Sequence, residues 1–138
     1  IKLKAPDVIE SVDMVTASFP GFPTDLQAQW MALMTLANGE STVTDEVYLD
    51  RFTHISELSR LGANISLKKN RAKVKGKKQL IGAPIMSTDI RASASLIIAA
   101  LAANGQSEIS RIYHIDRGYE KIEEKFKLLG ADIRRENG

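Results

Sequence analysis

The chain has 138 residues, and its 43% hydrophobic and 26% charged residues are typical of one globular domain that is large enough to bury a core. A net charge of +2 is too small to indicate a nucleic-acid or membrane partner. With no cysteine and two histidines, this stretch of sequence has no disulfide, no thiolate nucleophile and too few ligands for a metal cluster.

The longest apolar stretch, 92–103, is shorter than the roughly 20 residues that cross a bilayer, and no signal-peptide pattern precedes it. We therefore expect a cytoplasmic protein with no membrane partner, metal or cofactor. The sequence begins at Ile1, inside a predicted strand, so we expect it to be a fragment of a longer protein.

The first predicted helix has one apolar face, defined by three- and four-residue spacing. The face comprises Leu26, Trp30, Leu33, Met34 and Ala37. Asn38-Gly39 tolerates positive φ and predicts where this helix stops. A strand is predicted next, over 41–47.

A second helix is predicted from Ile55, Leu58 and Leu61. Gly62 ends it, and the chain continues as a hairpin with a turn near Asn70. The predicted unit is thus a helix, a strand, a helix and a hairpin.

The same elements return in the second half of the chain. The apolar positions of its two helices are Ile90, Ala94, Ile97, Ile98 and Leu101, then Ile122, Phe126 and Leu129. Asn104-Gly105 and Gly130 predict the helix ends, and a strand over 107–113 lies between them. The sequence ends after the first strand of the second hairpin, which would leave a sheet edge open to association.

Short motifs recur in the same order in both halves. They are Thr24-Asp25 and Thr88-Asp89, 37–39 and 103–105 (both Ala-Asn-Gly), Asp50-Arg51 and Asp116-Arg117, and 61–63 and 129–131 (both Leu-Gly-Ala). A unit of this length cannot bury its apolar face alone. We therefore expect a pseudo-symmetric array, with repeat one over about 18–80 and repeat two over about 81–138.

Thr24-Asp25-Leu26-Gln27 matches a capping box, in which side chains satisfy the free amides of a helix start. On this interpretation Asp25 only lies in the helix dipole. On the other, Asp25 projects from a rigid helix end into a cleft and acts as a general base on a hydroxyl. A base benefits from a raised pKa, so this second interpretation requires burial or a second carboxylate nearby.

Arg51 and Arg117 follow predicted strands, in loops where α/β folds gather ligand contacts. Their planar guanidinium groups suit a phosphate or a carboxylate. The alternative is that each arginine only neutralises the aspartate beside it. His54 and His114 are interpreted as surface or packing residues.

A basic run follows the first unit's second helix. It consists of Lys68, Lys69, Arg71, Lys73, Lys75, Lys77 and Lys78. The run resembles an RNA contact in charge, but it lacks interleaved aromatic residues. Its alternation with Leu67, Ala72 and Val74 favours the solvent face of a hairpin.

Three longer stretches are recognisable in this order: 19–29 (FPGFPTDLQAQ), 87–96 (STDIRASASL) and 113–120 (YHIDRGYE). The sequence resembles the bacterial UDP-N-acetylglucosamine enolpyruvyl transferases, also called 1-carboxyvinyltransferases, along its full length. The resemblance implies an α/β fold of two inside-out barrel domains, each with three copies of the unit and its helices packed inward. This chain would be two of the six units, the C-terminal third, and would need the remainder of the polypeptide to complete its cleft.

The resemblance also implies a reaction, which is transfer of the enolpyruvyl group of phosphoenolpyruvate to the 3-hydroxyl of UDP-N-acetylglucosamine, with release of phosphate. This is the committed step of peptidoglycan synthesis, on which bacterial cell shape and division depend. The roles implied for this chain are Asp25 as the carboxylate that takes the hydroxyl proton, Asp89 as a second active-site carboxylate, Val47 as a backbone contact of the nucleotide sugar, Arg117 as a phosphate contact, and Arg51 and Arg91 as cleft arginines.

Asp50 stands where the resemblance implies asparagine, which favours an ion pair between Asp50 and Arg51. The family's reactive cysteine and catalytic lysine lie outside this sequence, so we expect the chain alone to be inactive. The alternatives are the sister transferase that acts on shikimate 3-phosphate, an RNA-binding α/β repeat module, and a purely structural repeat scaffold. The three stretches favour the nucleotide-sugar enzyme.

Overall fold

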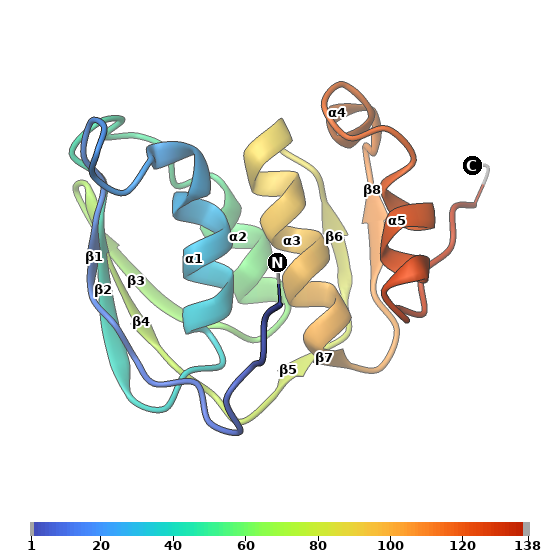
Figure 1. The fold of residues 1–138 in the computed structure, drawn as a ribbon, viewed down its shortest axis with the longest axis horizontal. Coiled ribbons are helices and arrows are strands. Elements are labelled where there is room, and N and C mark those ends of the chain that lie inside the picture. Colours follow the sequence, from blue (N-terminus) through green and yellow to red (C-terminus); the bar gives the residue numbers. More distant parts are fainter. Residues whose placement is uncertain (1, 137–138) are drawn as a thin grey trace.

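The computed structural model describes residues 2–136, and helices α1 and α3 pack side by side at its centre (Figure 1). The first unit contains β1 (Met14–Val15), the 3₁₀ turn η1 (Thr24–Leu26), α1 (Gln27–Met34), β2 (Glu40–Thr44), α2 (His54–Arg60), β3 (Asn64–Lys68) and β4 (Arg71–Lys75). The second unit contains β5 (Leu80–Ile81), β6 (Pro84–Met86), α3 (Ile90–Ala102), β7 (Ala103–Asn104), β8 (Glu108–Ser110), α4 (Tyr113–Asp116) and α5 (Ile122–Leu128).

The first unit forms a four-stranded sheet in the order β1-β2-β4-β3. β1 and β2 are parallel, and β2, β4 and β3 are antiparallel in succession. The predicted hairpin with its turn near Asn70 is therefore confirmed. Val43, Ala72 and Val74 are fully buried in the core beneath α1, which is the alternation expected of a sheet with one covered face.

The second unit repeats the parallel pairing in two separate two-stranded sheets. β5 pairs with β7 and β6 with β8, both in parallel, and α3 connects the two sides. Each unit also has an equivalent backbone hydrogen bond just beyond its parallel pair. Thr16 N–H donates to the Thr44 carbonyl at 2.9 Å, and Ser87 N–H donates to the Ser110 carbonyl at 3.0 Å.

The main core lies between α1, α3 and the four-stranded sheet. α3 is buried nearly all round from Ala92 to Ile97 because α1, α2, β5 and α4 all pack against it. The described residues form an α/β arrangement and no closed barrel. The repeat limits 18–80 and 81–138 stay a prediction, and β1 lies just before the first of them.

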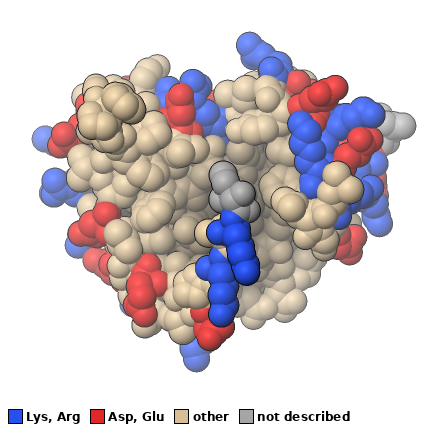
Figure 2. Space-filling view, viewed as in Figure 1, with Lys and Arg blue, Asp and Glu red and all other residues tan. Residues whose placement is uncertain are grey.

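The predicted inward faces of the two central helices are partly wrong. Leu33 is 38% exposed, and Ile98 and Leu101 are each 37% exposed, whereas Ala28 and Met31 are buried instead. Apolar periodicity locates a helix but does not say which side is covered when both sides are apolar. Figure 2 shows that the surface over α1 and α3 is mostly neutral, apart from the strip that carries the start of the chain.

Asn38-Gly39 and Asn104-Gly105 do not cap helices directly, contrary to the prediction. α1 ends at Met34, and Asn38 forms a parallel bridge with Glu10. Asn104 pairs with Ile81 in the same way. Gly39 and Gly105 then take φ of 109° and 94°, so the glycine is needed for a sharp turn into the next strand, not for the helix end.

The strand predicted over 107–113 is too long. It ends at Ser110 because Arg111 has a φ of 55° and the chain then enters α4. Leu129, predicted to face inward, is 82% exposed. No strand is present among the described residues from 131 to 136, so the open edge of a second hairpin is not seen there, and 137–138 lie outside the described residues.

The basic run lies on the solvent side of the β3–β4 hairpin, as the alternation predicts. Arg71, Lys73 and Lys75 are exposed, and the Lys73 ammonium pairs with Glu40 at 3.3 Å across to β2. Leu67 was expected to point inward but is 47% exposed. None of the helices in the described residues is both long enough and apolar enough to span a membrane.

Candidate functional site

Asp25 binds two arginines that come from different units. One carboxylate oxygen, Oδ1, accepts from Arg51 Nη1 at 2.9 Å and from Arg91 Nε at 2.5 Å. Arg51 lies between β2 and α2, and Arg91 is in the first turn of α3. The helix–strand connections of the two units thus converge on one carboxylate whose side chain remains 61% exposed.

Thr24 does not form the predicted capping box. The residue that precedes η1 is Pro23, and no side chain caps the turn. The Thr24 hydroxyl instead donates to Asp45 Oδ2 at 2.7 Å and accepts from Arg51 Nη1 at 3.1 Å. The capping box is therefore not formed, although Asp25 does lie in the first turn of η1.

Arg51 is held on several sides. Besides its bonds to Thr24 and Asp25, its guanidinium lies 4.6 Å from the centre of the Tyr48 ring, a cation–π distance. Gln27 Nε2 donates to its backbone carbonyl at 3.2 Å. The ion pair that the sequence favours between Asp50 and Arg51 does not form, because the guanidinium turns toward Asp25.

Asp89 has in the second unit the capping role that was considered for Thr24 in the first. It is the N-cap of α3, and its Oδ1 accepts from the backbone N–H groups of Arg91 and Ala92 at 2.9 and 3.0 Å. Oδ2 accepts from the Thr53 hydroxyl at 3.2 Å. Arg91 therefore stands between the two carboxylates, with its backbone on Asp89 and its guanidinium on Asp25.

Arg117 lines a surface hollow of about 340 Å³ together with Thr88, Asp89, Ile90 and His114. Its sequence neighbour Asp116 pairs with Arg135, at 2.7 Å, so the simple Asp116–Arg117 pair is not formed. Arg117 has no ion pair among residues 2–136. Its guanidinium is thus available to an anion that enters the hollow.

Val47 lies in the loop after β2 and is 47% exposed. Its backbone N–H is already engaged, because it donates to Asp45 Oδ1 at 3.0 Å. Its carbonyl oxygen accepts no hydrogen bond from the described part of the chain. A ligand that met this backbone would therefore meet the carbonyl as an acceptor.

Asp45 is a site-adjacent residue that the sequence analysis missed. It is fully buried, and its carboxylate accepts four hydrogen bonds. Burial raises its pKa, but the hydrogen bonds from Thr24, Thr16 and the loop amides outweigh burial and leave the pKa lowered. The available signal was positional: Asp45 shares the alternation of Ser41 and Val43, both on the covered face.

His54 is a packing residue, as one of the two predicted readings stated. It is 1% exposed and stacks on Phe52, and burial lowers its pKa to about 4, against an opposing effect of Asp89. His114 is only half-buried and faces the hollow of Arg117.

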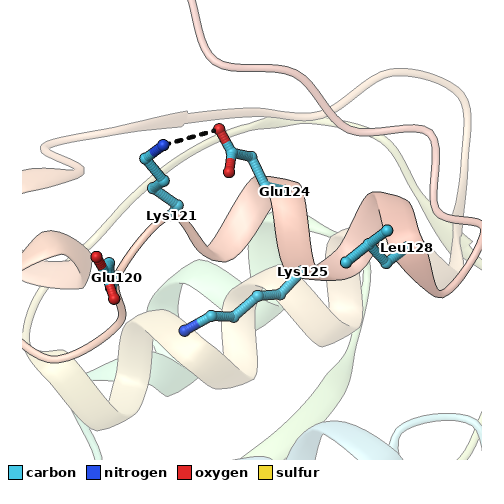
Figure 3. Close-up of a pocket in the computed structure, with 5 residues that line it drawn as sticks. All are labelled: Glu120, Lys121, Glu124, Lys125 and Leu128. Atoms are coloured by element: carbon cyan, nitrogen blue, oxygen red, sulfur yellow. Dashed lines mark ion pairs between the residues drawn. The ribbon is translucent and has the colours of Figure 1, made fainter.

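A second hollow, of about 260 Å³, lies on α5 and is lined by Glu120, Lys121, Glu124, Lys125 and Leu128 (Figure 3). Lys121 pairs with Glu124 there at 3.4 Å, and the charges balance. None of the predicted site residues lines it, so we do not place the site there. The described residues also contain no group of three or more side chains able to hold a metal ion.

Comparisons with known proteins identify the family to which the chain is similar. The sequence pattern of EPSP synthase (3-phosphoshikimate 1-carboxyvinyltransferase) matches residues 2–126. Relatives called UDP-N-acetylglucosamine 1-carboxyvinyltransferase are 56% identical in Prosthecochloris aestuarii and 53% identical in Myxococcus xanthus, over 99% of this chain. The chain spans 32%, about a third, of the length of each of these relatives.

Solved structures agree. The enolpyruvyl transferase NikO from Streptomyces tendae superposes with a TM-score of 0.84 at 30% identity, over 94% of this chain and 30% of NikO. An EPSP synthase from Acinetobacter baumannii gives a TM-score of 0.55 at 18% identity, over 85% of this chain and 28% of its own, which shows the shared fold alone. The α/β fold expected from the resemblance is thereby confirmed. With the family pattern covering nearly the whole sequence, the chain belongs to the EPSP synthase family of enolpyruvyl transferases.

Proposed function

We propose that this chain is part of a UDP-N-acetylglucosamine 1-carboxyvinyltransferase. The enzyme would transfer the enolpyruvyl group of phosphoenolpyruvate to the 3-hydroxyl of the nucleotide sugar. The choice of acceptor rests on the relatives that share 53–57% of residues with this chain, against 18% for the shikimate-specific structure. A role in the cytoplasm, in peptidoglycan synthesis and in cell shape and division follows from that activity.

The observation that carries the proposal is the meeting of Asp25, Arg51 and Arg91. Asp25 would accept the proton of the sugar 3-hydroxyl while the hydroxyl oxygen bonds to C2 of the enolpyruvyl group. The C2=C3 double bond opens in this step as C3 takes up a proton. It re-forms when C3 loses a proton and the bond from C2 to the phosphate oxygen breaks, so that phosphate leaves.

In this scheme Arg51 and Arg91 also control when Asp25 can act as a base. With two guanidinium groups on one oxygen, Oδ1 of Asp25 is already occupied by hydrogen-bond donors. Anionic substrate groups compete for the same guanidinium groups, since these suit phosphate and carboxylate equally. We infer that substrate binding draws Arg51 and Arg91 away from Asp25 and so prepares it as a base.

Two further residues complete the proposed substrate contacts. Arg117, which lines the hollow together with Asp89, would bind the phosphate of phosphoenolpyruvate. The free carbonyl of Val47 would accept a hydrogen bond from the nucleotide sugar. Asp89 would act mainly through α3, by holding the helix start that carries Arg91.

An NMR titration of this chain with UDP-N-acetylglucosamine tests the proposal. We expect amide shifts around Asp25 and Val47 and none in the β3–β4 hairpin, which serves as an internal control. Shikimate 3-phosphate is the matched competitor. The assignment would be contradicted if shikimate 3-phosphate caused shifts and UDP-N-acetylglucosamine did not. It would also be contradicted if a folded sample showed no shifts near Asp25 or Val47.

A further inference from the structure

Asp45 is a buried carboxylate to which the proposed mechanism assigns no part. Its Oδ1 accepts from the Thr16 hydroxyl at 2.7 Å and from the Val47 and Tyr48 N–H groups at 3.0 and 2.8 Å. Its Oδ2 accepts from the Thr24 hydroxyl at 2.7 Å. A buried carboxylate with this many donors is stabilised as an anion and is rigid in its site.

The two oxygens of Asp45 serve two different parts of the site. Oδ1 shapes the loop that presents the Val47 carbonyl and the Tyr48 ring. Oδ2 holds Thr24, which sits next to Asp25 and accepts from Arg51 Nη1 at 3.1 Å. A threonine hydroxyl has one proton, so donation to Asp45 leaves its lone pairs to face the guanidinium.

We propose that Asp45 is a positioning residue for the proposed transferase. It orients the Thr24 hydroxyl so that this group can only accept from Arg51, and it sets the loop on whose Tyr48 ring the same guanidinium lies. Arg51 is thereby aimed at Asp25 and at incoming anions. The inference rests on the proposed function for the identity of the ligand, but its geometry stands on the contacts above.

Asp45→Asn is a sharp test because it changes the direction of one hydrogen bond. If the amide keeps its oxygen toward the loop, its N–H₂ group replaces Oδ2 and donates to Thr24. The Thr24 hydroxyl proton then has no acceptor at residue 45, so the hydroxyl is no longer fixed with its lone pairs toward Arg51, and that contact is weakened. We expect the Arg51 side-chain N–H resonance to shift or broaden, and the dissociation constant for UDP-N-acetylglucosamine to rise about tenfold or more.

The matched control is Asp13→Asn. Asp13 also joins β1 to β2, because its Oδ1 accepts from Thr42 N–H at 2.6 Å, but it does not contact Thr24 or Arg51. This control should lower stability without moving the Arg51 resonance. Thr24→Val is a second variant in case Asp45→Asn fails to fold, because it removes the link to Arg51 and leaves the loop bonds of Asp45 in place.

An unchanged Arg51 resonance in Asp45→Asn or in Thr24→Val would overturn the positioning role. So would equal disturbance of Arg51 in Asp13→Asn, since the effect would then follow from general loosening of the sheet. If the nucleotide sugar shifts no amide in the unaltered chain, the proposed function fails, and the Arg51 resonance still decides the role of Asp45.

Discussion

At the scale of single residues, His54 links burial to pH. Its ring is buried at the start of α2, and burial lowers its pKa from 6.5 to about 4. The unfolded chain therefore binds this proton first as the pH falls. Stability is present in full above about pH 6.5 and is lost as the pH falls from there toward 4.

We expect the free energy of unfolding to fall by about 2 kcal/mol between pH 7.5 and pH 5, a window in which most carboxylates stay ionised. Denaturant unfolding at several pH values measures this fall. His54→Gln should flatten it whatever its own effect at pH 7.5. His114→Gln removes the chain's other imidazole as a control, and a fall that disappears in that variant instead would contradict the assignment to His54.

At the scale of elements, Gly76 is the point where β4 passes the end of α1. A Cβ added there would lie 1.7 Å from the Ala37 carbonyl oxygen, so the two backbones would have to separate. At the same crossing, Lys77 N–H donates to the Thr35 carbonyl at 2.8 Å. This hydrogen bond would be lost if the two backbones separated. We expect Gly76→Ala to reduce stability by about 3 kcal/mol or more.

Gly118→Ala is the informative comparison for thermal unfolding. Its Cβ would meet the end of the Ile90 side chain at 2.0 Å, and a side chain can turn aside where a backbone cannot. Gly118→Ala should therefore cost less than Gly76→Ala, and Ile90→Ala should recover much of the loss. Equal melting temperatures for the two glycine variants would contradict this, because the backbone at Ala37 would then yield as easily as the Ile90 side chain.

The elements also show how far the sequence could be read. The hairpin over β3 and β4 and the helix ends at Gly62 and Gly130 follow from local chemistry, alternation and positive φ, and these are confirmed. The faces of α1 and α3 were not readable in the same way, because a helix covered on several sides has no polar face to orient it.

The candidate site divides along the same line. The site residues could be predicted because their spacing recurs in both halves and resembles that of a family. Spacing does not indicate which side chains form hydrogen bonds with each other. The capping box and the Asp50–Arg51 pair are both plausible from neighbours in sequence. Neither forms, because each group bonds to a partner that is distant in the sequence. Thr24 bonds to Asp45, 21 residues away, and Arg51 bonds to Asp25, 26 residues away.

At the scale of the whole molecule, the proposed function makes this chain one half of a reaction centre. It supplies a carboxylate and three arginines on two units, and its site opens to solvent, since Asp25 is 61% exposed. Enolpyruvyl transfer requires that water is excluded from the site and that a group donates a proton during the transfer. Isolated residues 1–138 should therefore release no phosphate from phosphoenolpyruvate in the presence of UDP-N-acetylglucosamine.

The measurement is phosphate release over many hours at high protein concentration, where a host enzyme carried through purification would give a false signal. Asp25→Asn separates the two sources, because it removes the proposed base from this chain and leaves a contaminant untouched. Release that persists in Asp25→Asn comes from the contaminant, and release that this variant abolishes means that the chain is catalytic by itself. In that second case Asp25 would act as a base without a covering domain. Substrate would then have to displace Arg51 and Arg91 from Asp25 in open solvent, which is possible because exposed ion pairs are weak.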